Sequence, residues 1–221
     1  MFGHYGIVKR SEISELLLAP SESLNFELKA WLNLESVVEQ EKVARELIAL
    51  RNQNGGILVF GFDDESLEPL ALGRPKDVVA AYHQDKVQKV VKDFIEPPFE
   101  AKVHFAERDG QKYPVIEVPS GVLSPAIARR GGEEIRQYAV YMRSVHNGLL
   151  SSTMPRSAED WDSLMRICFD NREADIARFF RRHIAGIARE VQKMPELESP
   201  SAILDEGAQA YSKMIEGIRG V

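Results

Sequence analysis

The sequence is poor in cysteine, and its histidines are scattered. Cys168 is the only cysteine, so the chain cannot form an internal disulfide. It lies among apolar residues on an expected helix, where a free cysteine usually acts as a small buried hydrophobic side chain. The five histidines include no close pair. This composition argues against a structural zinc site and against a catalytic thiol.

Long apolar runs are also missing. No run approaches the roughly 20 apolar residues that a membrane-spanning helix needs. The first residues, Met1 to Gly6, do not combine a basic region with a long apolar stretch, as a secretory signal would. We therefore expect a protein without a membrane segment, located in the cytoplasm.

Three common site signatures are absent as well. The sequence has neither Gly-x-x-x-x-Gly-Lys-Ser/Thr nor Gly-x-Gly-x-x-Gly, which argues against P-loop and dinucleotide sites. It also lacks the Gly-x-Ser-x-Gly of many serine hydrolases. The formal net charge of −6 argues against coating of DNA by bulk electrostatics, although a local basic patch is compatible with it.

Periodic apolar residues predict the first elements of the fold. Residues 24–34 alternate between apolar and polar, with Glu27 and Lys29 on the polar face, which is typical of a half-buried strand. Ser36 and Glu39 have the spacing of a capping box, which predicts that a helix begins there and continues to about residue 54.

A pair of glycines, Gly55-Gly56, separates that helix from a short apolar run. Residues without Cβ let the chain turn sharply and pack closely, and residues 57–62 are apolar on both faces, as in a central strand. The later patterns predict a helix over 77–95, strands over 103–105 and 115–118 with a loop longer than two residues around Asp109-Gly110, and a strand over 138–143. This order predicts an α+β fold, a mixed β-sheet with packed helices.

The pattern changes to helical from Ser157 onward, so we expect two parts in the chain. Residues 1–155 should form the α+β domain, and residues 156–221 a helical C-terminal extension. Within the extension, residues 194–201 resemble a linker, and residues 202–218 could form a final helix.

Acidic residues form the main candidate site. Glu22 and Glu27 bracket the entry to the first strand, and Asp63-Asp64 follows the central strand. If the two strands are neighbours, these carboxylates converge and suit Mg²⁺ or Mn²⁺, with Lys29 beside them as a phosphate contact. The alternative is that the aspartates form a turn and the glutamates are solvated.

These segments resemble the Schlafen AlbA_2 domain family in order and spacing over roughly residues 21–144. The family typically reads Glu-Phe-Lys, Ala-Phe-Ala-Asn-Thr-x-Gly-Gly, Gly-Val-Asp-Asp, Val-Pro and Tyr-Val-Arg. This chain has Glu22-x4-Glu27-Leu28-Lys29, then Ala49 to Asp64 with Asn52-Gln53-Asn54-Gly55-Gly56, then Val115 to Pro119 followed by Pro125, and Tyr141-Met142-Arg143. It departs from the family pattern at Leu28, Arg51 and Val145-His146-Asn147.

The resemblance implies a nucleic-acid-binding domain and, by analogy with animal Schlafen cores, an endoribonuclease that uses a divalent metal ion on structured RNA such as tRNA. Glu22 and Glu27 match the family's glutamate pair, and Asp64, with Asp63 close behind, matches its aspartate. Because animal Schlafen cores pair two lobes, the resemblance also implies a homodimer. RNA is the expected partner ahead of DNA.

Basic residues for the nucleic-acid backbone are scattered along the sequence. Lys29 and Arg143 lie in matched motifs, Arg129-Arg130 in a glycine-rich loop, and Lys86, Lys89 and Lys92 along one side of a predicted helix. Two alternatives to the nuclease stay open: a non-catalytic module that binds DNA or RNA or has a regulatory role, and a protein-interaction domain.

Overall fold

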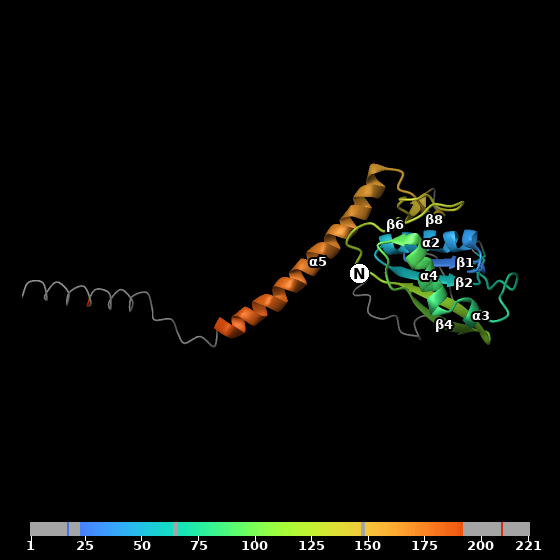
Figure 1. Cartoon of the computed structure of the whole chain (residues 1–221), viewed down its shortest axis with the longest axis horizontal. Coiled ribbons are helices and arrows are strands. Elements are labelled where there is room, and N and C mark those ends of the chain that lie inside the picture. The colour runs from blue at the N-terminus through green and yellow to red at the C-terminus, as the bar shows by residue number, and fades with distance from the viewer. Residues whose placement is uncertain (1–16, 18–22, 64–65, 147–148, 192–208, 210–221) are drawn as a thin grey trace, which may run out of the picture. The chain divides into compact units, whose positions relative to one another are not determined.

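The computed structural model describes residues 17, 23–63, 66–146, 149–191 and 209 (Figure 1). Glu22 and Asp64 therefore lie outside the described residues, as do the predicted linker and nearly all of the predicted final helix. The chain divides into two compact units, Met1–Glu173 and Ala174–Val221. The predicted boundary after residue 155 stays a prediction.

A four-stranded mixed sheet forms the centre of the first unit, with strand order β1-β2-β5-β4. Strand β1 (Phe26–Lys29) pairs in parallel with β2 (Gly56–Phe60), while β2 pairs antiparallel with β5 (Gln111–Val118), and β5 with β4 (Lys102–Arg108). All five residues of β2 are buried, as a strand apolar on both faces requires. The predicted central strand and the α+β fold class are confirmed.

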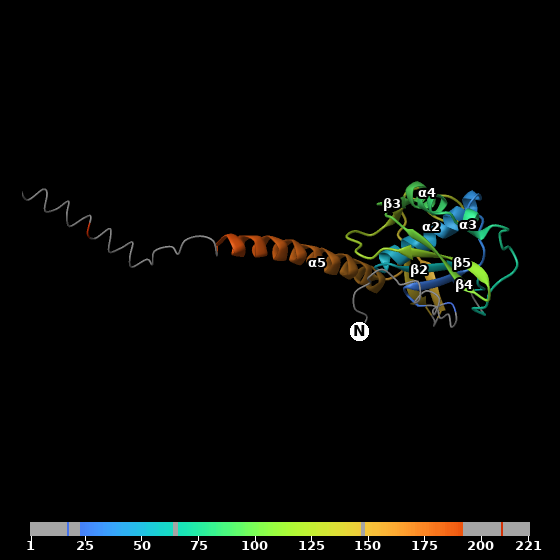
Figure 2. The same cartoon turned by 90° about the horizontal axis from the view of Figure 1, so that it is seen from below.

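Helices cover one face of this sheet. Helix α2 (Val37–Asn52) and helix α4 (Gln84–Phe94) lie on the same side of β2, β5 and β4 (Figure 2), and the short helix α3 (Val78–Ala81) precedes α4. The valines of α4 recur at helical spacing and are buried, so its apolar face packs into the core.

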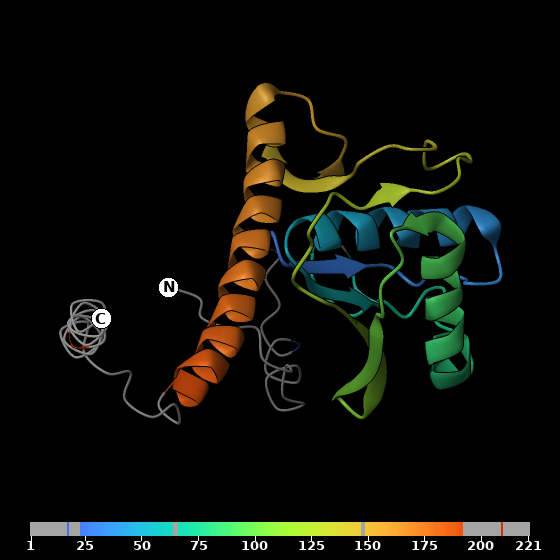
Figure 3. The same cartoon turned by 60° about the vertical axis from the view of Figure 1, so that its left-hand side comes forward.

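Two small sheets complete the unit. Strand β3 (Ile95–Glu96) pairs with β6 (Ile127–Ala128), and β7 (Met142–His146) pairs with β8 (Leu149–Thr153). The β7–β8 hairpin contacts α2, which thus lies between the hairpin and the sheet (Figure 3). From the hairpin, the Arg143 side chain reaches Glu27 of β1.

The turn between α2 and β2 requires its glycines. Gly55 has a φ of 92°, and a Cβ atom there would lie 2.8 Å from the backbone oxygen of Val118. A Cβ atom on Gly56 would overlap the carbonyl oxygen of Asn25. Since only glycine leaves that space, the two glycines allow β2 to lie directly between β1 and β5.

Asn52, at the end of α2, fixes two later segments. Its buried side chain donates to the carbonyl oxygens of Ala126 (2.9 Å) and Tyr141 (2.7 Å), and its Oδ1 accepts from the Ala126 N–H (2.7 Å). Buried polar groups require such partners. The asparagine of the matched motif therefore has a structural role, which is to hold the start of β7 beside α2.

The first predicted strand is shorter than expected. The ladder ends at Lys29, whose carbonyl oxygen accepts from Gly61 N and Phe62 N. Gly61 has a φ of 99°, and the space next to it is filled by the Trp31 ring. The chain continues with the same alternation, but its backbone bonds go to other partners: the Tyr82 hydroxyl donates to Leu32 O and accepts from Leu32 N.

The predicted capping box of α2 is wrong. Ser36 is the N-cap residue but makes no side-chain capping bond, and Glu39 accepts from the backbone N–H of Asn33 instead. The carboxylate still satisfies a backbone donor ahead of the helix. It reaches further back along the chain than the motif predicts.

Three other boundaries differ from the prediction. The helix expected over 77–95 is broken at Tyr82, whose ring turns inward to lie 4.9 Å from that of Phe60. The β4–β5 loop is a two-residue turn, Asp109-Gly110, with both φ values positive, so the expectation of a longer loop is wrong. The strand expected over 138–143 begins at Met142.

The C-terminal helix α5 (Ala158–Val191) confirms the predicted change to helix. The Ser157 hydroxyl caps its start by accepting from Asp160 N at 3.1 Å. Over the residues that the structure describes, α5 included, no helix is both long and apolar enough to cross a membrane.

Candidate functional site

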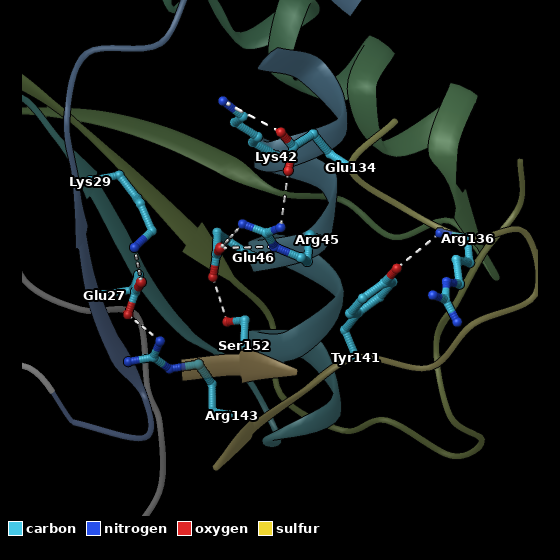
Figure 4. A network of polar contacts seen from close by, with 10 residues as sticks. All are labelled: Glu27, Lys29, Lys42, Arg45, Glu46, Glu134, Arg136, Tyr141, Arg143 and Ser152. Atoms are coloured by element: carbon cyan, nitrogen blue, oxygen red, sulfur yellow. Dashed lines mark hydrogen bonds and ion pairs between the residues drawn. The ribbon is translucent and has the colours of Figure 1, made fainter. Parts of the chain in front are cut away.

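Glu27 lies at the centre of a buried charged network. It is 2% exposed on β1, and its two carboxylate oxygens face two different cations. Oε1 lies 2.6 Å from Lys29 Nζ, and Oε2 pairs with Arg143 Nη1 (Figure 4). Residues two apart on a strand share a face, so the predicted alternation places Glu27 and Lys29 side by side, as observed. That face is covered, however, and not solvated.

Arg143 is the second deeply buried charge. It is 1% exposed on β7, and its Nη2 donates to the carbonyl oxygen of Ser23 at 3.2 Å. Its Nε has no hydrogen-bond partner in the part of the chain that the structure describes. The arginine therefore links the β7–β8 hairpin to β1 and to the segment before it. In this conformation its guanidinium faces Glu27 and does not reach the surface.

A second buried carboxylate, Glu46 of α2, lies close enough to Glu27 to affect its pKa. Glu46 Oε2 accepts a hydrogen bond from the Ser152 hydroxyl of β8, and its Oε1 lies 3.4 Å from Arg45 Nε. Arg45 Nη1 lies 3.3 Å from Glu134, and Lys42 pairs with the same carboxylate at 3.6 Å (Figure 4). The charged residues thus form two bonded groups, one around Glu27 and one around Glu46, which interact through the repulsion between the two carboxylates.

Burial raises the pKa of Glu27 from its ordinary value of 4.5 to about 7. The nearby Glu46 raises the pKa further, and Lys29 and Arg143 oppose this by favouring the charged form. Desolvation outweighs the two ion pairs because the carboxylate has almost no contact with water. A buried carboxylate that titrates near neutral pH is a recognised mark of functional sites, although structural networks produce it too.

The described part of the predicted metal site consists of Glu27 and Asp63, and both carboxylates are bonded within the protein in this conformation. Mg²⁺ and Mn²⁺ need several oxygen ligands, but Glu27 already faces two cations. Asp63 Oδ1 accepts from both the backbone N–H and the hydroxyl of Ser66, each at 2.8 Å, as in a turn. Within the described residues, no three His, Cys, Asp or Glu side chains could hold a metal ion. Glu22 and Asp64 lie outside them.

The remaining predicted contacts differ in exposure. The Lys29 side chain is 24% exposed and faces Glu27. Arg129 and Arg130 are exposed. In the predicted lysine row, Lys86 pairs with Glu35 at 2.7 Å and Lys89 with Asp93 at 2.7 Å. Lys86 and Lys89 of the predicted row are thus each paired with an acidic residue.

A basic surface forms where α4 ends. Arg129 Nη1 donates to the Lys92 carbonyl oxygen at 3.1 Å. The Arg130 guanidinium lies 3.8 Å from the centroid of the Phe94 ring, and Phe94 itself is buried. The pKa of Asp93 is lowered first by its hydrogen bond from Lys89 and further by the charges of Arg130 and Arg129. We name this set the α4-end cluster: Lys89, Lys92, Arg129 and Arg130.

Sequence reasoning missed two parts of these sites. Glu46 and Ser152 are not part of any recognised motif, and a glutamate in a helix or a serine in a strand is usually a surface residue. The contact of Arg129 with the end of α4 was also not predicted, since it depends on the pairing of β3 with β6. The available signal was the position of Arg129-Arg130 directly after an apolar pair.

Two solved structures are similar to this chain. The DIP2311 protein from Corynebacterium diphtheriae is 15% identical with a TM-score of 0.48, and the match covers 69% of this chain but only 27% of that chain. The N-terminal domain of a protein described as related to the ATP-dependent DNA helicase RecG, from Nitrosomonas europaea, is 17% identical with a TM-score of 0.40, with 67% and 98% covered. None of the curated proteins matches the chain.

A family model settles the relationship. The model described as Schlafen, AlbA_2 matches residues 22–146, which is more than half of the chain. The match includes the residues of the Glu27 network on β1, α2 and β7 and the whole of the α4-end cluster. The family suggested by the sequence motifs is thereby confirmed, and the chain belongs to the Schlafen AlbA_2 family.

Proposed function

We propose that this chain is a nucleic-acid-binding domain and that its contact surface is the α4-end cluster. Membership of the Schlafen AlbA_2 family supports a nucleic-acid partner. The observation on which the location rests is the gathering of Lys89, Arg129 and Arg130 around the carboxylate of Asp93. In a chain with a net charge of −6, such a local excess of cations is where phosphates would bind.

The test is a binding titration of fluorescently labelled RNA and DNA at several salt concentrations. Changing Arg129 and Arg130 together to alanine should weaken binding about tenfold or more. The affinity should also depend less steeply on salt concentration, because binding with fewer phosphate contacts releases fewer counterions. The matched control is Arg166→Ala, an exposed arginine of α5 that pairs with Asp162 at 2.5 Å. Equal affinity of the double variant and the wild type would exclude this surface.

A second candidate function is a metal-dependent endoribonuclease, with Glu22, Glu27 and Asp64 as its acids and Mg²⁺ or Mn²⁺ as its cofactor. The observation that favours it is the buried Glu27 carboxylate, with its pKa raised to about 7. We propose tRNA incubation with each metal ion, comparing wild type with Glu27→Gln. Cleavage that requires the metal and is lost in the variant would support this function, and intact tRNA in both would exclude it.

The preference for RNA over DNA and the homodimer are further parts of the proposal. Both derive from the family resemblance. Competition between RNA and DNA of the same sequence in the binding titration tests the preference. Size-exclusion chromatography with light scattering tests the dimer, and a strict monomer at high concentration would exclude it.

A further inference from the structure

Tyr138 is an exposed aromatic residue beside the α4-end cluster. It lies in the loop between β6 and β7, its side chain and backbone together are 67% exposed, and no ring contact involving it occurs among the described residues. An exposed ring beside cations offers a face on which a base can stack while the cations contact its phosphates.

Backbone hydrogen bonds hold Tyr138 in place. Its N–H donates to the Ala128 carbonyl oxygen at 2.7 Å, and Ala128 N–H donates to Ala139 O at 2.9 Å. The Gln137 side chain donates to the Arg129 carbonyl oxygen at 3.2 Å. The backbone of Tyr138 is thus fixed next to the chain position from which Arg129 and Arg130 extend.

The conformation of Tyr138 is unfavourable for its residue type. Its φ is 62°, in the left-handed region that glycine adopts easily and a bulky aromatic residue rarely does. Strain of this kind persists where the surrounding bonds impose it, and it concentrates at functional positions. Here its result is to present the ring outward while the segment stays bonded to β6.

We propose that Tyr138 stacks on an unpaired base while Arg129, Arg130 and Lys92 contact the adjoining phosphates. The domain would then bind single-stranded nucleic acid or the unpaired loops of structured RNA. An exposed ring beside cations matches the stacking platforms of single-strand-binding proteins, which tolerate any sequence because every base has a π face. Bases within a duplex are already stacked and cannot reach the ring. This inference rests on the proposed function and specifies its substrate class.

The experiment compares four ligands of equal length: single-stranded RNA, single-stranded DNA, duplex DNA and an abasic strand that retains the phosphates. We expect wild type to bind the single strands about tenfold or more tightly than the abasic strand. Tyr138→Ala should lose most of that difference, and Tyr138→Phe should keep it within about twofold, since phenylalanine retains the stacking face. Thermal unfolding of both variants checks that they fold.

Two outcomes separate this inference from the proposed function. If wild type binds the abasic strand or the duplex as tightly as the single strand, or if Tyr138→Ala keeps full single-strand affinity, stacking is excluded while nucleic-acid binding stands. If wild type binds none of the four ligands even at low salt, the proposed function fails and stacking fails with it.

Discussion

Two clusters of charged residues in the same domain have opposite environments. In the Glu27 network, the carboxylate and Arg143 are removed from water and face each other. In the α4-end cluster, Arg129 and Arg130 are exposed, and both lie near the carboxylate of Asp93. A buried charge must be paired within the protein, whereas an exposed excess of cations remains available to an anionic ligand. A residue that matches a family motif, such as Arg143, can therefore be buried and not lie at a binding surface.

The largest effect should follow from removing the buried arginine. Arg143→Met leaves the Glu27 carboxylate buried without one of its two counterions, which should lower the free energy of unfolding by about 3–5 kcal/mol at pH 8. Urea unfolding measures this. The loss should be smaller at pH 5, where Glu27 can take up a proton. A cost below about 1 kcal/mol at both pH values would show that the network contributes little to stability.

The second effect concerns pH. From about pH 4.5 to 7, folded Glu27 keeps a proton that unfolded Glu27 has released, so the free energy of unfolding falls as pH rises through this window. The fall is about 3 kcal/mol and is complete above the folded pKa. Glu27→Gln cannot titrate, so the stability of the variant relative to wild type should increase by that amount between about pH 5 and 8. An unchanged difference across this range would contradict the raised pKa.

The third effect concerns the exposed arginines of the α4-end cluster. Replacing Arg129 and Arg130 by alanine should change the free energy of unfolding by about 1 kcal/mol or less, because the two residues are solvated. The same change should weaken nucleic-acid binding by about 1.4 kcal/mol, which corresponds to tenfold. Measuring both quantities on one protein sample distinguishes a binding surface from a structural one. A large loss of stability with unchanged binding would reverse the roles of the two clusters.

The smallest effect should come from a surface ion pair. Arg166→Ala removes the partner of Asp162 on α5, where both side chains are mostly exposed. Solvated pairs of this kind contribute about 0.5 kcal/mol or less to stability. Thermal unfolding and the binding titration should both remain close to wild type. This variant shows how little an arginine contributes without burial or a ligand.

Much of the fold could be predicted from local patterns. The buried strand β2 followed from its unbroken apolar run, and the turn before it followed from Gly55-Gly56, since few other sequences fit that geometry. The boundaries that were wrong depended on distant partners. Tyr82 breaks the helix between α3 and α4 because its hydroxyl bonds to Leu32, fifty residues earlier in the chain.

The candidate sites could be predicted only in part. The side-by-side position of Glu27 and Lys29 follows from the two-residue period of a strand, so the sequence suffices for it. The presence of Arg143 and Glu46 around the same carboxylate does not follow from any local pattern, because they come from β7 and α2. The α4-end cluster likewise needs the pairing of β3 with β6.

The sequence by itself determined the family, the central strand and the glycine turn, because these depend on short motifs whose geometry few residues allow. Only the tertiary structure decided which charges are buried and which are exposed. Burial depends on the elements that close over a residue, and here Arg143 of the β7–β8 hairpin packs against Glu27 on the polar face of β1. Desolvation then turns Glu27 and Arg143 into a buried pair, while Arg129 and Arg130 stay in water.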